Sequence, residues 1–317
     1  MKNKIIQGEA LEELKKLKSE SIDCVMTSPP YWALRDYGVE GQLGLEPTFD
    51  QFINNLCNIF DEVQRVLKKS GTCWVNLGDT YNAGRSGGHA GGLKGLDKPE
   101  NSPNQSGVNV KELKAKSLVM IPFRFAIEMV NRGWILRNVI VWHKKNCMPS
   151  SVKDRFTVDF EYLFFFSKSK KYWFDRQFEP YKEGTEERYK YNFDKSGRQW
   201  SDDKESLFNE IGGIGELNPQ GRNKRCVWTI NPQPFPEAHF AVYPEKLCET
   251  PIKSGCPKDG IVLDPFMGAG TTAVMAKKLG RDFLGIELNP EYIKIAEKRL
   301  KKAGLDSEPL TEWMKKP

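Results

Sequence analysis

Four consecutive residues near the N-terminus, Ser28-Pro29-Pro30-Tyr31, have the types needed to hold a planar group that carries an amino nitrogen. They follow an apolar run over residues 22–26, which is typical of a buried strand. The prolines end that strand, because each fixes its own φ and lacks a backbone N–H. The residue before a proline is restricted to extended conformations, so the Ser28 hydroxyl and the proline carbonyls form a rigid row of acceptors. Tyr31 adds an aromatic face beside them, although a proline turn with core aromatics is the plainer alternative.

A second group of informative residues lies near the C-terminus, around a glycine turn. A strand pattern over 260–264 leads into the turn, a helix pattern over 273–279 follows it, and a second strand pattern over 282–286 ends at Glu287. This arrangement is a β-α-β unit whose glycines let the backbone approach a ligand. Glu287 follows Gly268 by 19 residues (287 − 268). That spacing is close to the one at which an acidic residue meets ribose hydroxyls in nucleotide-binding folds.

The spacing Gly268-x-Gly270-x-x-Ala273 also satisfies the dinucleotide pattern, so a dinucleotide-binding oxidoreductase stays open as a distant alternative. Asp264 argues against it, because a carboxylate at the mouth of the turn would repel a pyrophosphate. The same carboxylate would attract an ammonium group, such as the amino end of a methionine moiety. The predicted ligand is therefore S-adenosyl-L-methionine.

Together the two segments resemble the DNA amino-methyltransferases that act on cytosine N4 or adenine N6. In that family an S/D/N-P-P-Y/F tetrad holds the target amino group, and a DPFxGxGTT-like stretch holds S-adenosylmethionine. Here the tetrad comes first and the cofactor turn last, which is typical of the permuted β group and favours DNA over protein or ribosomal RNA as substrate. Serine in the first position resembles the cytosine-N4 members, with adenine N6 as the alternative. The resemblance covers about residues 3–80, 117–175 and 239–303.

The resemblance implies a role for each residue that matches a family motif. The catalytic residues would be Ser28, Pro29, Pro30 and Tyr31. Trp32 and Trp142 would flank the target base, with core packing as the alternative for both. The cofactor would meet Glu9, Thr27, Phe240, Ala241, Asp264, Pro265, Phe266, Gly268, Gly270, Thr271, Thr272 and Glu287.

The distribution of charge favours a nucleic-acid partner. The chain has 317 residues and a net charge of +6, and the segment 111–155 alone holds ten Lys or Arg against three acids. A basic band of this kind is expected beside phosphates. A solvated helix face or a non-catalytic DNA-binding module would also explain it. The predicted DNA contacts are Lys144, Lys145, Lys153, Arg155, Arg222, Lys224 and Arg225.

Cysteine and histidine usage argues against a metal centre. Seven cysteines occur without a C-x-x-C pair, and there are three histidines, so no metal is predicted. No cysteine follows a proline, which disfavours the covalent chemistry of cytosine-C5 methyltransferases. Scattered cysteines fit a reducing cytosol, and no leader or membrane-spanning run is visible. We expect a cytoplasmic protein encoded by a prokaryote or a phage.

Strand and helix patterns predict an α/β fold, and the resemblance implies its form: a Rossmann-like, circularly permuted methyltransferase domain whose mostly parallel sheet carries helices on both faces, plus a smaller target-recognition insert. Double-stranded DNA is the predicted partner, while a cognate restriction endonuclease and a homodimer stay open. Along the way we expect a helix over 49–69, a strand over 72–77, a helix over 117–131, and strands over 134–142 and 159–167. The predicted organisation is a catalytic half over 1–175 with a mobile loop at about 82–116, target recognition over 176–238, a cofactor half over 239–303 and a tail over 304–317.

Overall fold

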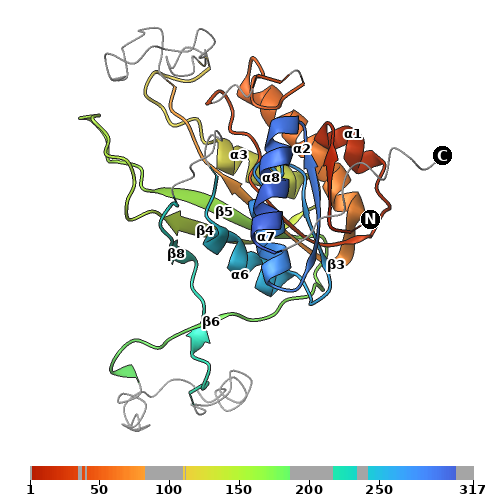
Figure 1. Ribbon diagram of the computed structural model, residues 1–317. Coiled ribbons are helices and arrows are strands. Elements are labelled where there is room, and N and C mark those ends of the chain that lie inside the picture. The colour runs from red at the N-terminus through yellow and green to blue at the C-terminus, as the bar shows by residue number, and fades with distance from the viewer. Residues whose placement is uncertain are drawn as a thin grey trace, which may run out of the picture. The chain divides into compact units, whose positions relative to one another are not determined.

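The computed structural model describes residues 2–34, 38–39, 41–82, 110, 112–185, 217–233 and 242–304 (Figure 1). The chain divides into two units, one made of residues 1–175 and 226–317 and the other of residues 176–225. Most of the predicted mobile loop and part of the predicted recognition region therefore lie outside the described residues. Among the described residues, no helix combines the length and apolar character that crossing a membrane requires.

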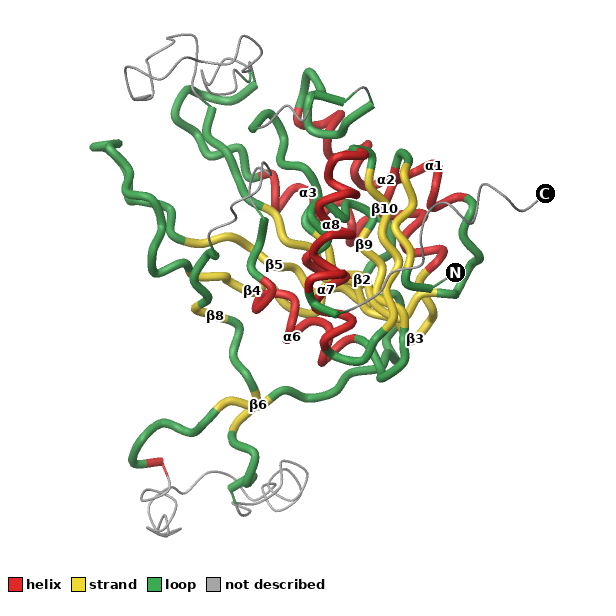
Figure 2. Tube along the Cα trace, in the orientation of Figure 1, coloured by secondary structure: helices red, strands yellow, loops and turns green. Residues whose placement is uncertain are grey.

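The larger unit is built on one mixed sheet, whose strands are drawn in yellow in Figure 2. Among the described strands, five neighbouring pairs run parallel and two run antiparallel, which confirms the predicted mostly parallel sheet. The order across the sheet is β1 (Lys4–Gln7), β10 (Asp282–Glu287), β9 (Ile261–Asp264), β2 (Ile22–Thr27), β3 (Leu67–Leu77), β5 (Phe160–Ser167), β4 (Ile135–His143) and β8 (Val227–Thr229).

Successive residues of the central strands pack into two separate hydrophobic cores, one on each face of the sheet. Val25 of β2 and Leu263 of β9 belong to one core, while Met26 and Val262 belong to the other. Side chains alternate across a strand, so a strand buried on both faces is apolar along its whole length. This is why β2 and β9 are short continuous apolar runs in the sequence.

Helices cover both faces, as predicted. The first core includes α1 (Ala10–Lys15), α2 (Phe49–Val66) and α3 (Ile121–Asn131). The second includes α6 (Glu245–Gly255), α7 (Thr271–Lys278) and α8 (Pro290–Lys302), which Figure 1 shows in teal to blue on the near side of the sheet. The central strands β10, β9 and β2 are therefore covered on both faces, and a ligand can reach them only at the ends of the strands.

Two helix boundaries differ from the predicted ones. The helix expected over 49–69 ends at Val66, because Leu67 already pairs with Ile22 as the first residue of β3. The helix expected from residue 117 begins at Ile121, after Met120 with a left-handed φ of 65° and with Pro122 in its first turn. Proline fits the first turn of a helix, where no N–H partner is required.

The smaller unit, residues 176–225, contains one short described pairing. β6 (Phe178–Glu179) runs antiparallel to β7 (Arg222–Asn223). Glu179 accepts ion pairs from Arg222 at 2.9 Å and from Arg225 at 2.6 Å. These ion pairs link β6 to β7 and to the residues that follow β7.

Candidate active site

The two motifs that are far apart in the sequence lie at the same edge of the sheet. β2, which leads into the tetrad, pairs in parallel with β9, which leads into the glycine turn, and Val25 lies opposite Leu263. Parallel neighbours present their carboxyl ends at one edge. There the Thr27 hydroxyl donates to Asp264 Oδ1 at 2.6 Å, across 237 residues of sequence.

This edge is also a switch point in the connections of the sheet. From β9 the chain passes through α7 to β10 on one side, while from β2 it passes through α2 to β3 on the other side. Ligands of open α/β sheets bind in the crevice at such a point. A cavity of about 930 Å³ opens here, large enough to hold a sizeable ligand.

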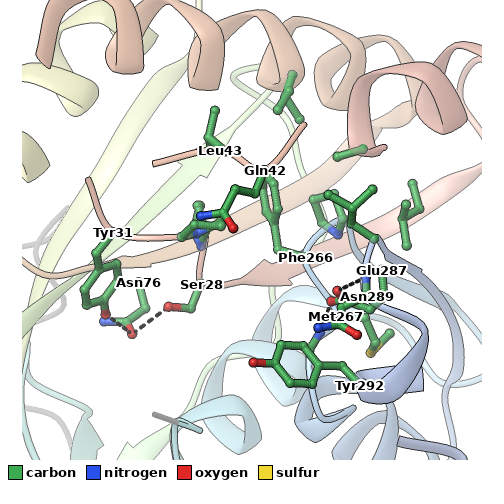
Figure 3. Close-up of a pocket in the computed structure, with 18 of the residues that line it drawn as sticks. Ser28, Tyr31, Gln42, Leu43, Asn76, Phe266, Met267, Glu287, Asn289 and Tyr292 are labelled. Atoms are coloured by element: carbon green, nitrogen blue, oxygen red, sulfur yellow. Dashed lines mark hydrogen bonds between the residues drawn. The ribbon is translucent and has the colours of Figure 1, made fainter. Parts of the chain in front are cut away.

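One half of the cavity is centred on the Glu287 carboxylate (Figure 3). Its Oε2 accepts from the Gly268 N–H at 2.7 Å, and its Oε1 accepts from the Asn289 N–H at 2.8 Å. Gly268 has a left-handed φ of 51°, which shapes the turn that brings its amide to the carboxylate. Burial and, to a smaller degree, the neighbouring Asp264 raise the pKa of Glu287. Each carboxylate oxygen has more than one lone pair, so the residue can still accept two hydroxyls.

Other walls of this half come from three separate parts of the chain. Gly8 and Glu9 follow β1, Pro265 and Phe266 begin the turn after β9, and Tyr292 lies in α8. Glu9 also caps α1, because its carboxylate accepts from the Leu11 and Glu12 N–H groups. An acidic centre between a glycine turn and aromatic side chains fits an adenosine moiety, so the residues present fit S-adenosylmethionine.

Asp264 does not face this cavity, and the expectation that it meets an ammonium group directly is not met. The side chain is fully buried beneath the turn, where Oδ1 accepts from Thr27 and from the Phe266 N–H at 3.1 Å. Its Oδ2 accepts from the Tyr243 hydroxyl at 2.9 Å. Burial raises the pKa of Asp264, and these bonds oppose that rise. The carboxylate therefore fixes the shape of the turn.

Three further predicted cofactor residues also lie behind the cavity wall. Thr27 is buried, and its hydroxyl donates to Asp264. Thr272 is also buried, and its hydroxyl donates to the Met26 carbonyl at 3.1 Å. Gly270 lies against α8: a Cβ there would be 2.7 Å from Ala296 Cβ. Thr271 does line the cavity. Phe240 and Ala241 lie outside the described residues.

The other half of the cavity is lined by the tetrad. The Ser28 hydroxyl donates to Asn76 Oδ1 at 3.3 Å, and the Tyr31 hydroxyl donates to Glu161 Oε2 at 2.7 Å. Asn76 Nδ2 donates to the same Glu161 oxygen at 3.1 Å. Lys144 forms an ion pair with Glu161. Figure 3 shows Ser28, Tyr31 and Asn76 together, on the opposite side of Phe266 from Glu287.

Asn76 and Glu161 were not identified from the sequence. Each is a polar residue among mostly apolar neighbours, Asn76 in the segment 73–77 of β3 and Glu161 in β5. Such a residue needs a buried partner, and that requirement was visible in the sequence. The identity of that partner could not be predicted from the sequence, because it depends on the antiparallel register that places Asn76 opposite Leu163.

Trp32 and Trp142 lie in different environments. Trp32 is 3% exposed, packs edge-on against Phe49 with ring centroids 6.1 Å apart, and donates to the Glu46 carbonyl at 2.9 Å. It lies in the core, which corrects its predicted place beside the target base. Trp142 is buried but lines the cavity, with the Lys144 ammonium 4.4 Å from its ring centroid.

The predicted DNA contacts fall into two groups. Lys144 lines the cavity, Lys145 and Lys153 are exposed, and the Arg155 guanidinium lies 3.5 Å from the Tyr81 ring centroid. In the smaller unit, Arg222 and Arg225 pair with Glu179, and the Lys224 N–H donates to the Gln177 carbonyl at 2.9 Å.

Comparison with known proteins agrees with this geometry. A family model described as DNA methylase, of the N6/N4 type, matches residues 22–298. The type II methyltransferase M.Cfr9I of Citrobacter freundii is 41% identical over 93% of this chain and 87% of its own length. M.SmaI of Serratia marcescens is 40% identical over 94% of this chain and 90% of its own length.

Two solved structures show the same fold. The PvuII DNA methyltransferase, named as cytosine-N4-specific, superposes with a TM-score of 0.61 at 20% identity, covering 99% of this chain and 90% of that one. A putative DNA modification methylase of Thermus thermophilus, solved with S-adenosyl-L-methionine, gives a TM-score of 0.58 at 24% identity, covering 94% and 95% of the two chains.

Proposed function

Because the chain belongs to the DNA methylase family of N6 and N4 amino-methyltransferases, we propose that it methylates the N4 amino group of cytosine. Family membership confirms two predictions, S-adenosylmethionine as the cofactor and DNA as the substrate. Membership of this family also argues against the two alternatives, a dinucleotide oxidoreductase and a non-catalytic DNA-binding module. The base and the roles of individual residues belong to the proposal.

The observation that carries the choice of cytosine is Ser28 at the head of the tetrad, on the cavity wall. Serine in this position resembles the cytosine-N4 members of the family. Since its proton is directed to Asn76, the Ser28 oxygen keeps lone pairs that can accept from an amino group. The cytosine-N4 specificity in the name of the PvuII enzyme, which shares the fold, supports the same choice.

Glu287 is the centre of the proposed cofactor site. Its carboxylate would accept the two ribose hydroxyls, while Phe266 and Tyr292 would flank the adenosine. When bound, S-adenosylmethionine supplies a methyl group on a positively charged sulfonium. Asp264 would act from beneath, by holding the turn that forms the floor.

The tetrad would prepare the amino nitrogen for attack. Its lone pair is delocalised into the ring of the base, so it is a poor nucleophile. Ser28 Oγ and the carbonyl of Pro29 or Pro30 would accept hydrogen bonds from its two N–H groups and draw the hydrogens out of the ring plane, which frees the lone pair. Once the nitrogen carries the methyl group, it would lose one of these protons to solvent. Tyr31 would stack on the base, with its ring held by the hydroxyl bond to Glu161. The contribution of the protein is alignment and preorganised polarity.

The target base must leave the duplex to reach this cavity, at a cost of a few kcal/mol. Stacking on an aromatic side chain returns roughly 1–3 kcal/mol per base.

The relatives M.Cfr9I and M.SmaI are named as type II methyltransferases, which supports a role in protecting DNA from a cognate restriction endonuclease.

Analysis of modified nucleosides tests the proposal. Unmethylated bulk DNA is incubated with the protein and S-adenosylmethionine, hydrolysed to nucleosides and analysed by mass, with Ser28→Ala as the control. We expect N4-methylcytosine from the wild type and a much smaller amount from the variant. N6-methyladenine would overturn the choice of base and leave the family intact. No modified nucleoside would overturn the activity itself.

A further inference from the structure

The loop between β4 and β5, residues 144–159, exposes two large apolar side chains. Phe156 is 96% exposed and Met148 is 88% exposed. In Figure 1 this loop is the yellow-green segment that projects beyond the ends of β4 and β5, and Figure 2 shows it in green as a loop. Single exposed apolar residues are ordinary. A nearly fully exposed phenylalanine on a loop whose two ends lie at the cavity is more informative, because its side chain contributes nothing to the core.

The exposure of Phe156 is not the result of a loop without contacts. Its two preceding neighbours are both docked on the larger unit. Asp154 pairs with Lys116 at 2.6 Å, and the Arg155 guanidinium lies over the Tyr81 ring at 3.5 Å. The backbone that carries Phe156 is therefore held in place, while the phenyl ring itself faces solvent.

The loop also starts and ends at the cavity. Lys144 at its beginning and Glu161 just after its end both line the wall next to the tetrad. Between them the exposed Lys145 and Lys153 bring positive charge to the same loop as the apolar side chains. Cations contact phosphates, and an apolar side chain held among them can reach the stacked bases.

We propose that this loop enters the DNA duplex and that Phe156 fills the space left by the flipped base. The inference rests on the proposed function, since it needs a base in the tetrad pocket. Extruding a base leaves a gap in the stack, and proteins that open base steps use side chains such as Phe, Leu and Met as wedges. Phe156 can stack on the flanking bases, so it would stabilise the extruded state over the paired one.

The test compares two DNA substrates that differ only in the cost of flipping. Once sequencing has located the methylated site, one short duplex carries that site fully paired. The second has an abasic position opposite the target base, so the base is already unpaired. Phe156→Ala is expected to lower kcat/KM on the paired duplex about 10- to 100-fold, as for loss of one base–aromatic stack. On the second duplex it should act near the wild-type rate.

Three controls distinguish a wedge from a general surface effect and from a defect in cofactor binding. Ile127→Ala removes a side chain that is 63% exposed on α3, away from this loop in the sequence, and should leave both rates unchanged. Phe156→Trp should retain activity on the paired duplex. Affinity for S-adenosylhomocysteine should be the same in every variant.

The outcomes that overturn the proposal are distinct. Wild-type activity of Phe156→Ala on the paired duplex would exclude the wedge. An equal loss on both duplexes would make Phe156 a plain contact. A change in sedimenting mass on mutation would make the loop a contact between two copies of the chain. If sequencing finds no site that the wild type methylates, the proposed function fails along with the wedge.

Discussion

Glu287 combines a structural role with the proposed binding role in one side chain. Two backbone N–H groups fix its carboxylate, yet it lies on the cavity wall. Its burial raises its pKa, so it gains a proton at a higher pH than an ordinary glutamate. A protonated carboxyl has fewer acceptor sites for ribose hydroxyls than a carboxylate.

We therefore expect cofactor binding to be complete above the raised pKa of Glu287 and to weaken as the pH falls through it. Glu287→Gln should lower the affinity for S-adenosylhomocysteine about 10- to 100-fold, since hydrogen bonds to a charged group contribute about 1.5–3 kcal/mol. It should also flatten this pH dependence, because a glutamine does not titrate. Calorimetry across pH measures both, with the exposed Glu291→Gln as the matched control. An unchanged affinity in Glu287→Gln would exclude the ribose role.

Sequence reasoning located the residues that carry motifs but not those that support them. Ser28 and Glu287 were predicted because each stands at the end of a recognisable strand. Asp264 was predicted as a direct ligand, and the structure buries it instead. There Tyr243, from an earlier segment of the chain, donates its hydroxyl to Asp264 Oδ2. No local pattern connects those two residues.

At the scale of elements, the approach of α8 to the glycine turn sets the floor of the site. Gly270 precedes α7 with a φ of 77°, and a Cβ there would lie 2.7 Å from Ala296 Cβ in α8. The glycine therefore serves two needs, a left-handed backbone and close contact between helix and turn.

Gly270→Ala should destabilise the protein by roughly 2–4 kcal/mol, because strain at positive φ and the close contact both apply. Gly280→Ala is the matched control. It also has a positive φ, 70°, but nothing lies within 4 Å of its Cβ position, so only the strain applies. Urea unfolding measures both free energies. Equal losses in the two variants would show that contact with α8 contributes nothing.

Element boundaries were harder to predict than element types. The amphipathic pattern of α2 runs on into Leu67, and only pairing with Ile22 shows that this residue starts β3. α6 was not predicted as a helix, since Pro251 lies inside it and its apolar positions are few. Tertiary packing decided both cases.

At the scale of the whole molecule, the two motifs that form the site lie more than 200 residues apart in the chain, at Ser28 and at Gly268. The sheet resolves this by placing β2 next to β9, although the chain between them contains most of the other strands. Alternation of strands and helices, together with the resemblance to a permuted methyltransferase family, was enough to predict the mostly parallel sheet. The smaller unit, residues 176–225, has no such period, and its structure could not be predicted.

The central claim is that these two distant segments form one site with separate tasks, the tetrad for the base and the glycine turn for the cofactor. Tyr31→Ala tests it most directly, with radiolabelled methyl transfer to DNA and S-adenosylhomocysteine calorimetry on the same preparation. We expect a loss of about 100-fold or more in turnover, from lost stacking and alignment, with cofactor affinity unchanged. Full turnover, or a loss of cofactor affinity parallel to the loss of turnover, would contradict the account.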